Sequence, residues 1–513
     1  MDATTILQIK PALTRFLHQF DDCFARSQTR GHLTTYVQGQ LGPLPRKSVE
    51  PIADAAGTPP RTLQEFLSLS RWDEAMMRDS LQQLVARRHH HEQAVGIIDE
   101  SSFIKKGDKT ACVQRQHCGA AGKLENGVVS VHLGYATPAA GSAGLEEANH
   151  LGFHTLLDGE LYLPEKTWHN DRARCAEAGI PDDVVYRSKH AIALDQYRRA
   201  VRNGVHLAWM TFDEFYGRST VFLREFDTVG QNYVAEVPVD FHVWTHRPQV
   251  LHRRHAREMR PPAKAGRPRR HRRLKVKNNP TARVDQVLRH SPTLRRRPWV
   301  NYHVKEGSKG PMVWQVKHLR VYLKDEHGLP ASGGRPYHLI IARNPLDPNA
   351  IKYFISNAPE STSIQTMLLV AFSRWKIERM FEDSKMELGL DHFEARKFNA
   401  ISRHLLLSCV SHLFLAEFRQ QHATVGASGV RGEKDADAQP DRHRPEHARR
   451  PLVRRRTLFA KARPNDQHAT GHNTTAQRQG RQEPSQTNPQ EITRDRHHHE
   501  NLETMSVGTD LAL

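Results

Sequence analysis

Three acidic residues that lie far apart in the sequence could together hold divalent metal ions. Asp99 and Asp213 each end a short apolar run, AVGIID and LAWMTFD, with the composition of a strand buried on both faces. Glu378 lies farther along, in a stretch of helical composition. Hard divalent cations prefer carboxylate oxygens on a rigid frame, and two ions about 3.5–4 Å apart can activate an attacking oxygen and stabilise a leaving one. The three acids therefore predict a metal-dependent site.

Two basic residues accompany Glu378 on its helix. At 100° per residue, Arg374 and Lys385 both fall within about 40° of Glu378. The apolar stripe that would bury this helix lies beside them and consists of Val370, Ile377 and Leu388. This pattern indicates one metal ligand flanked by two cations that could hold phosphate.

Each of these residues also fits an ordinary structural role. An acid that follows a strand is often a turn or N-cap residue, and a Glu four residues after an Arg is often a surface ion pair. Composition and spacing alone therefore reach no further than a metal-dependent site.

The stretch before the first acid, residues 1–90, has helical composition. Within it, SVEPIADAAG and TPPRTLQEFLSLS predict two helices around a tight turn, with Gly57 as C-cap, Thr58 as N-cap, and Pro59 and Pro60 in the first turn of the second helix. Such a pair is compatible with a DNA-binding helix-turn-helix, although helix pairs are common in any α-rich domain.

The elements that must position the acids predict a mixed α/β domain. Residues 91–250 contain the strand candidates AVGIID, TACVQRQ and VVSVHLGYA, separated by turns at CGAAGK and ENG, then a helix around SKHAIALDQYRRAVRNG and the strand LAWMTFD. Residues 251–360 comprise a basic segment and β-rich sequence, and residues 361–420 a helix carrying Glu378 and a closing apolar helix. Residues 421–513 lack apolar periodicity and are expected to be disordered. One hypothesis is that a frameshift in the gene causes this tail to be translated out of frame.

The charge balance favours a polyanionic partner. The formal net charge is +19, and cationic side chains that neutralise phosphates release condensed counterions. The most basic stretch contains Gly266-Arg267-Pro268-Arg269-Arg270, which resembles an AT-hook core for a narrow minor groove. Arg267, Arg269 and Arg270 are therefore candidate DNA contacts, with a solvated basic loop as the alternative.

The remaining composition points to a cytoplasmic protein. The five cysteines are scattered and form no CxxC pair, so neither a disulfide framework nor a structural zinc site is expected. The N-terminus has no secretory signal pattern, and no apolar run approaches membrane-spanning length. We expect no membrane association.

Several motifs, in chain order, resemble a large branch of bacterial DDE transposases of insertion sequences. The segment from Arg374 to Lys385 resembles the Tyr-Arg-Glu-Lys signature of that branch, with three residues between Arg374 and Glu378 and six between Glu378 and Lys385. IIDESSFIKKG, VQRQHCGAAGKLENG and FDEFYG resemble the first-aspartate strand, the following segment and the second-aspartate motif. Together the matches extend over roughly residues 20–415.

The resemblance implies an RNase H-like catalytic domain with a β-rich insertion between the second Asp and the Glu. Asp99, Asp213 and Glu378 would then hold two Mg²⁺ ions, with Mn²⁺ as an alternative. Arg374 and Lys385 would contact double-stranded DNA, as would Lys105 and Lys106 in the lysine-bearing loop. A homodimer is expected, because two transposon ends must be joined to target DNA, and the DNA-bound protein would be associated with the nucleoid.

One departure and three alternatives accompany this resemblance. Ala371 stands where the signature has Tyr, which puts the efficiency of the reaction in doubt more than its chemistry. An inactive transposase remnant is the main alternative. The others are a non-catalytic DNA-binding regulator and a metal-free hydrolase with paired carboxylates, for which no apolar pocket is indicated.

Overall fold

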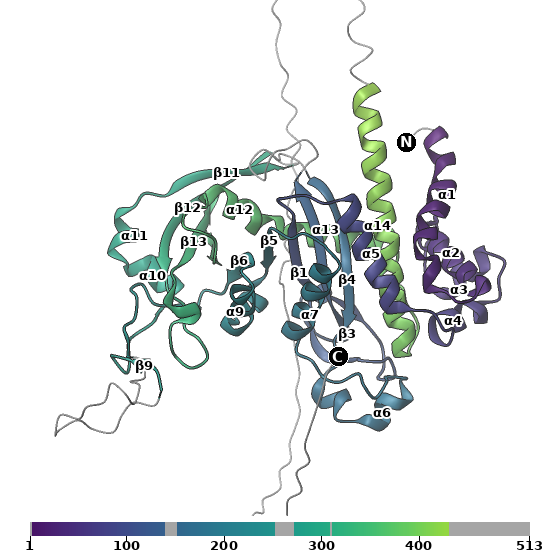
Figure 1. Ribbon diagram of the computed structural model, residues 1–513, viewed down its shortest axis with the longest axis horizontal. Coiled ribbons are helices and arrows are strands. Elements are labelled where there is room, and N and C mark those ends of the chain that lie inside the picture. The colour runs from purple at the N-terminus through teal and green to yellow at the C-terminus, as the bar shows by residue number, and fades with distance from the viewer. Residues whose placement is uncertain (1–2, 139–150, 252–270, 308–309, 430–513) are drawn as a thin grey trace, which may run out of the picture. The chain divides into compact units, whose positions relative to one another are not determined.

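A mixed β-sheet is the centre of the described structure. In this computed structural model the described residues are 3–138, 151–251, 271–307 and 310–429, all within one unit, Met1–Ala438 (Figure 1). Across them the ten-stranded sheet has the order β11-β12-β13-β14-β6-β5-β1-β3-β2, and β4 also pairs with β3. Its strands are β1 (Val95–Ile104), β2 (Gln114–Cys118), β3 (Lys123–Pro138), β4 (Leu151–Leu161), β5 (Trp209–Phe212), β6 (Asn232–Val237), β11 (Val300–Gly307), β12 (Gly310–Val321), β13 (Tyr337–Asn344) and β14 (Asp347–Ser356).

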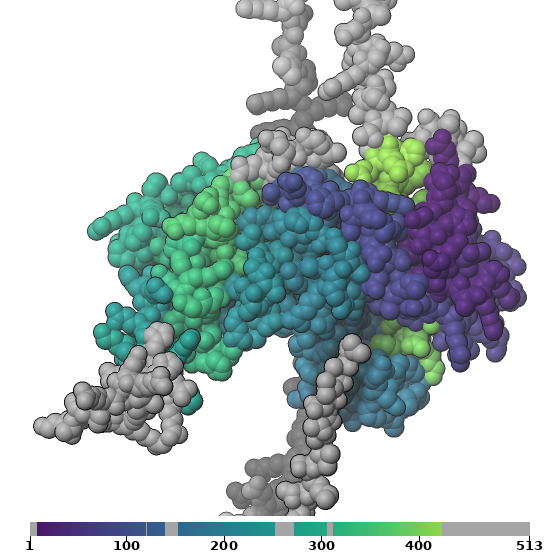
Figure 2. Space-filling view, viewed as in Figure 1, coloured from purple at the N-terminus to yellow at the C-terminus, as the bar shows by residue number. Residues whose placement is uncertain are grey.

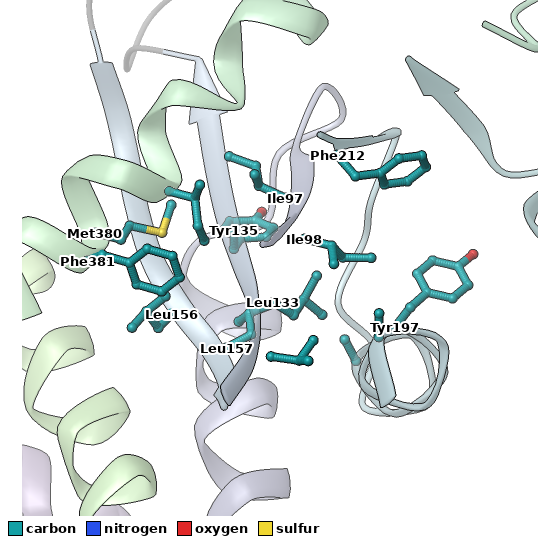
Figure 3. Close-up of a cluster of buried hydrophobic side chains, with 14 of the residues drawn as sticks. Ile97, Ile98, Leu133, Tyr135, Leu156, Leu157, Tyr197, Phe212, Met380 and Phe381 are labelled. Atoms are coloured by element: carbon teal, nitrogen blue, oxygen red, sulfur yellow. The ribbon is translucent and has the colours of Figure 1, made fainter. Parts of the chain in front are cut away.

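Three neighbouring strands in the middle of the sheet are parallel. β1 pairs in parallel with β5, and β5 with β6, whereas every other pair in this sheet is antiparallel. All four residues of β5 are buried, as expected for a central strand covered on both faces. Helices cover both faces: Met380 and Phe381 reach the sheet from one side and Tyr197 from the other (Figure 3). The helices that carry them are α13 (Trp375–Met386) and α7 (Lys189–Arg202).

The N-terminal part is helical, in agreement with its composition. Its helices are α1 (Ala3–Leu17), the 3-10 helix His18–Cys23, α2 (Ser27–Leu41), α3 (Val49–Ala55), α4 (Pro60–Ser68) and α5 (Glu74–Arg88). Helices α1, α2, α4 and α5 pack against the long helix α14 (Phe398–Gly429), beside which the N-terminal part lies in the space-filling view (Figure 2). Buried polar contacts join them: the Tyr36 hydroxyl lies 2.8 Å from Nδ1 of His404, and Gln40 Nε2 donates to Ser408 Oγ at 2.9 Å.

The predicted turn between α3 and α4 is present, with one change of cap. Gly57 has a φ of +61°, the left-handed conformation that ends many helices. The N-cap of α4 is Pro59 rather than Thr58, and no side chain caps this helix. Proline begins the helix because its fixed φ already suits the first turn.

Three further expectations differ from the structure, and one strand was not expected. The segment ENG is not a turn, because β3 continues through it, and the unexpected strand is β4. The strands of the β-rich sequence after residue 300 extend the central sheet, because β14 pairs with β6. The expected helix around Glu378 is divided at Arg374 into α12 (Ile364–Ser373) and α13. Helix α14 continues to Gly429, beyond the boundary expected at residue 420.

The smaller elements complete the described chain. They are Gly119–Ala121 and Ala331–Gly334 (3-10), Glu165–His169 (π), α6 (Arg172–Glu177), α8 (Glu214–Gly217), α9 (Thr220–Thr228), α10 (Val284–His290), α11 (Pro292–Arg296), and the strand pairs β7 (His242–Val243) with β10 (Ala282–Arg283) and β8 (Val250–Leu251) with β9 (Arg273–Leu274). No helix among the described residues has the length and apolar character needed to cross a membrane.

Candidate active site

Asp99 and Asp213 occupy neighbouring positions on two parallel strands. Ile98 of β1 is the register partner of Phe212 of β5, and each acid is the next residue along its strand. Asp213 directly follows β5, and its Oδ1 caps α8 by accepting hydrogen bonds from the backbone N–H groups of Phe215 and Tyr216. Asp99 does not end its strand as the sequence predicted, because β1 continues to Ile104. The parallel pairing with β5 does stop at Ile98, so Asp99 lies where the two strands separate.

Burial makes this pair of acids difficult to ionise together. It raises the pKa of Asp99 to about 7, and the nearby charge of Asp213 adds to the rise while the Arg374 guanidinium opposes it. The pKa of Asp213 is also raised by burial, and the hydrogen bond from the backbone N–H of Tyr216 partly offsets this rise. A divalent cation would relieve both the desolvation and the repulsion, because its charge is the largest in such a site. Carboxylates in this arrangement fit a hard, oxygen-seeking ion.

Glu378 is linked to Asp99 through Arg374. The Nη1 of Arg374 donates to Oδ2 of Asp99 at 3.0 Å, and its Nη2 donates to Oε1 of Glu378 at 2.9 Å. The Glu378 side chain is half exposed, with an exposed fraction of 51 %. Within the described parts of the chain, no three His, Cys, Asp or Glu side chains lie close enough to hold a metal ion. The third acid therefore lies beside the pair, on the far side of a guanidinium.

The other basic candidates lie in different surroundings. Lys385 lies over the Phe103 ring, 5.8 Å from its centroid, and burial lowers its pKa. Lys105 is partly buried; its Nζ donates to the backbone oxygen of Phe393 at 2.6 Å, and burial lowers its pKa to about 8. Lys106 is exposed. Lys106 is thus the lysine of this loop that solvent and a polyanion can reach most easily.

The AT-hook candidates Arg267, Arg269 and Arg270 lie outside the described residues.

Two residues that the sequence analysis did not select lie beside the acids. Glu236 of β6 follows Ala235, which is the register partner of Phe212, so it continues the row of Asp99 and Asp213. Among the described residues, the buried Tyr216 hydroxyl has no hydrogen-bond partner. Its pKa is raised by burial and then by the charges of Glu100 and the two aspartates. The signal for Glu236 was an acid within the apolar run YVAEV, whereas no sequence signal marked Tyr216.

Comparison with known proteins relates this chain to endonucleases and transposases. The family model described as DDE superfamily endonuclease matches residues 19–311, which include Asp99 and Asp213 and end before Glu378. A probable transposase for insertion sequence element IS701 from Microchaete diplosiphon is 27% identical over 219 residues, 42% of this chain. The aligned part spans 50% of that relative's length. A piggyBac transposase synaptic complex with hairpin DNA matches with a TM-score of 0.32 and 11% identity over 83% of this chain and 76% of that one, a likeness too weak to support an argument.

Proposed function

The chain belongs to the DDE superfamily of endonucleases, and from this membership we propose that it is an insertion-sequence transposase. It would cut double-stranded DNA at the ends of its element and join the freed 3′ ends to target DNA. The observation that carries the proposal is the register of β1 and β5, which places Asp99 and Asp213 side by side. The similarity to the IS701 transposase supports the choice of a transposase among DNA-cleaving enzymes.

The catalytic core would be RNase H-like, interrupted by a β-rich insertion. The antiparallel strands β4, β3 and β1, followed by the parallel strands β5 and β6, support this assignment. The insertion would comprise the basic segment and β-rich sequence of residues 251–360, so it lies between Asp213 and Glu378 in the sequence. The helical N-terminal domain would comprise residues 1–90, the first part of the catalytic domain residues 91–250, the insertion residues 251–360, and the catalytic and closing helices residues 361–420. The C-terminal tail would begin at residue 421, although α14 continues into it as far as Gly429.

Asp99, Asp213 and Glu378 would hold two divalent ions, Mg²⁺ or Mn²⁺. When bound, the ions supply an activated water or hydroxyl and stabilise the charge that develops on the leaving oxygen. The two aspartates are placed to share the ions. Glu378 would join them by giving up its hydrogen bond with Arg374 and binding an ion instead. Its side chain is half exposed.

The basic residues would hold the DNA. Arg374, the N-cap residue of α13, and Lys385, within α13, would bind phosphates near the cut. Lys105, Lys106 and the basic segment with Arg267, Arg269 and Arg270 would add affinity that depends on salt more than on sequence. A homodimer would hold two ends together.

A cleavage assay tests this proposal. The substrate is a duplex that carries the element's terminal inverted repeat, identified from the nucleotide sequence flanking the gene. The wild-type chain should cut it with Mg²⁺ or Mn²⁺ and not in EDTA. Asp213→Asn should bind the duplex but not cut it, whereas Asp240→Asn, at an exposed acid paired with Arg218, should cut normally.

The alternatives give other results in the same assay. An inactive remnant or a DNA-binding regulator would bind the repeat and cut it with neither ion. A metal-free hydrolase would cut equally well in EDTA. Cleavage by Asp213→Asn at the wild-type rate would refute the site.

A further inference from the structure

The guanidinium of Arg374 faces a third carboxylate besides Asp99 and Glu378. Its Nε lies 3.9 Å from Oε2 of Glu236, while its two terminal nitrogens face the other two acids at 3.0 Å and 2.9 Å. Each nitrogen of the guanidinium therefore has a carboxylate of its own. The Arg374 side chain is 21 % exposed, so these acids replace most of its contact with water.

Glu236 is held more firmly than Glu378. It is buried within β6 and forms an ion pair with Lys352 of the neighbouring strand β14. Its backbone is confined as well, because a Cβ at Gly217 of α8 would overlap the carbonyl oxygen of Glu236. The Glu378 side chain, in contrast, is half exposed on a helix and has solvent beside it.

If the proposed function is correct, Glu236 is the one acid of the three that stays beside Arg374 when the metal ions bind. Asp99 and Glu378 are proposed metal ligands, and once their oxygens turn to divalent ions, Arg374 loses both of its hydrogen-bonded acceptors. A largely buried guanidinium without a carboxylate is strongly unfavourable. Glu236 stays in place, because Lys352 and Gly217 fix it and because it belongs to no proposed metal shell.

We propose that Glu236 is a positioning residue, which holds Arg374 at the edge of the site while Asp99 and Glu378 serve the ions. With Nε kept near Glu236, the two terminal nitrogens of Arg374 are directed toward the place that a scissile phosphate would occupy. This inference rests on the proposed function of the site.

A simpler role for Glu236 is to join β6 to β14 through Lys352. In that role, Glu236→Gln and Lys352→Met would have the same effect, whether or not a divalent ion is present and whatever residue stands at position 374. A positioning role instead makes the effect of Glu236 depend on both the ion and Arg374.

The test is a double-mutant cycle on the dissociation constant of the full chain for a terminal-repeat duplex, in EDTA and in Ca²⁺. In Ca²⁺, Arg374→Gln should weaken binding roughly tenfold, the size of a lost charge-assisted hydrogen bond. Glu236→Gln should weaken it roughly threefold to tenfold, with no further loss in the Arg374→Gln background. In EDTA, where Asp99 and Glu378 still hold Arg374, Glu236→Gln should have less than about a twofold effect.

Lys352→Met is the matched comparison: it removes one restraint on Glu236 but leaves its carboxylate beside Arg374, so it should weaken binding in Ca²⁺ less than Glu236→Gln does, and by less than about twofold in EDTA. An effect of Glu236→Gln that is equal in EDTA and Ca²⁺, or equal in both Arg374 backgrounds, would overturn the inference while leaving the proposed function intact. If the wild-type chain does not prefer the terminal repeat over unrelated DNA, the proposed function fails, and this inference with it. Should Glu236→Gln not fold, Glu236→Asp keeps the charge but shortens its reach, and it should show the same dependence on Arg374.

Discussion

The guanidinium of Arg374 donates a hydrogen bond from Nη1 to Oδ2 of Asp99 at 3.0 Å, although 275 residues separate the two in the sequence. The same guanidinium donates to Glu378, so a fixed positive charge lies between an acid of the sheet and an acid of the helix. This charge competes with any divalent ion that the two acids would share. The site is therefore assembled around an internal cation of its own.

Removal of that internal cation should strengthen metal binding by the protein without DNA. In Arg374→Gln, Asp99 and Glu378 lose a competing positive charge, and the affinity for Mn²⁺ should rise roughly tenfold, about 1.4 kcal/mol. Isothermal titration calorimetry at pH 8 measures it. Arg379→Gln is the control, because Arg379 pairs with Glu382 and Asp383 one turn along. Weaker Mn²⁺ binding by Arg374→Gln would contradict this competition.

Glu378 and Glu382 offer a matched pair on one helix. Their side chains are about equally exposed, at 51 % and 52 %, but Glu378 pairs with Arg374 and Glu382 with Arg379. Glu378→Gln should lower the rate of DNA cleavage at least about a hundredfold, because a metal ligand contributes several kcal/mol to the transition state. Glu382→Gln should stay within about threefold of the wild type. The reverse order of the two rates would assign the third acid to Glu382.

The sequence predicts the local elements of this fold better than their pairing. The apolar runs before Asp99 and Asp213 are strands, and the helix pair around Gly57 is present. β1 is longer than predicted because the polar residues Ser101 and Ser102 continue it against β3. The pairing of β14 with β6 has no local signal, because it depends on contacts between residues more than 100 positions apart, such as Ser356 with Val234.

Among the strands of the candidate site, an acid was recognised only where it ended an apolar run. That signal found Asp99 and Asp213, whose adjacency then followed from parallel strand pairing. It passed over Glu236, which lies inside its strand. The spacing of Arg374 and Glu378 indicated one helix face, yet the contact of Arg374 with Asp99 required the packing of that helix on the sheet. The role of the three acids as metal ligands stays a prediction.

The buried carboxylate of Asp158 should be among the most sensitive positions for stability. Asp158 of β4 has no exposed side-chain surface and binds Arg78 of α5 at 2.9 Å and Arg199 of α7 at 2.5 Å. Asp158→Ala would leave two mostly buried guanidinium groups without their acceptor, and should lower the free energy of unfolding by about 3–5 kcal/mol. Urea denaturation measures it. Asp182→Ala, at a fully exposed acid paired with Arg172, should change it by less than about 0.5 kcal/mol. Equal effects of the two variants would show that Asp158 is not a structural anchor.

Acid should destabilise the fold in part through His404, which is fully buried on α14 and faces Tyr36 of α2. Its Nε2 faces the backbone oxygens of Gly389 and Leu390, so the neutral ring accepts the Tyr36 hydroxyl at Nδ1. Burial lowers the pKa of His404 from 6.5 to about 4. Because the unfolded chain binds this proton more readily, the stability from the neutral ring is complete above pH 6.5. It is lost as the pH falls from 6.5 toward 4.

The His404→Gln variant isolates this contribution. One pKa unit corresponds to about 1.4 kcal/mol, so His404 alone should account for about 2 kcal/mol of the stability that the wild type loses between pH 7 and pH 5. Urea denaturation at the two pH values should show a loss smaller by that amount in His404→Gln. Other buried histidines, among them His132 and His412, titrate unchanged in both proteins and cancel in the comparison. His327→Gln, at an exposed position, is the control, and an equal loss in wild type and His404→Gln would mean that His404 takes up its proton in the folded state.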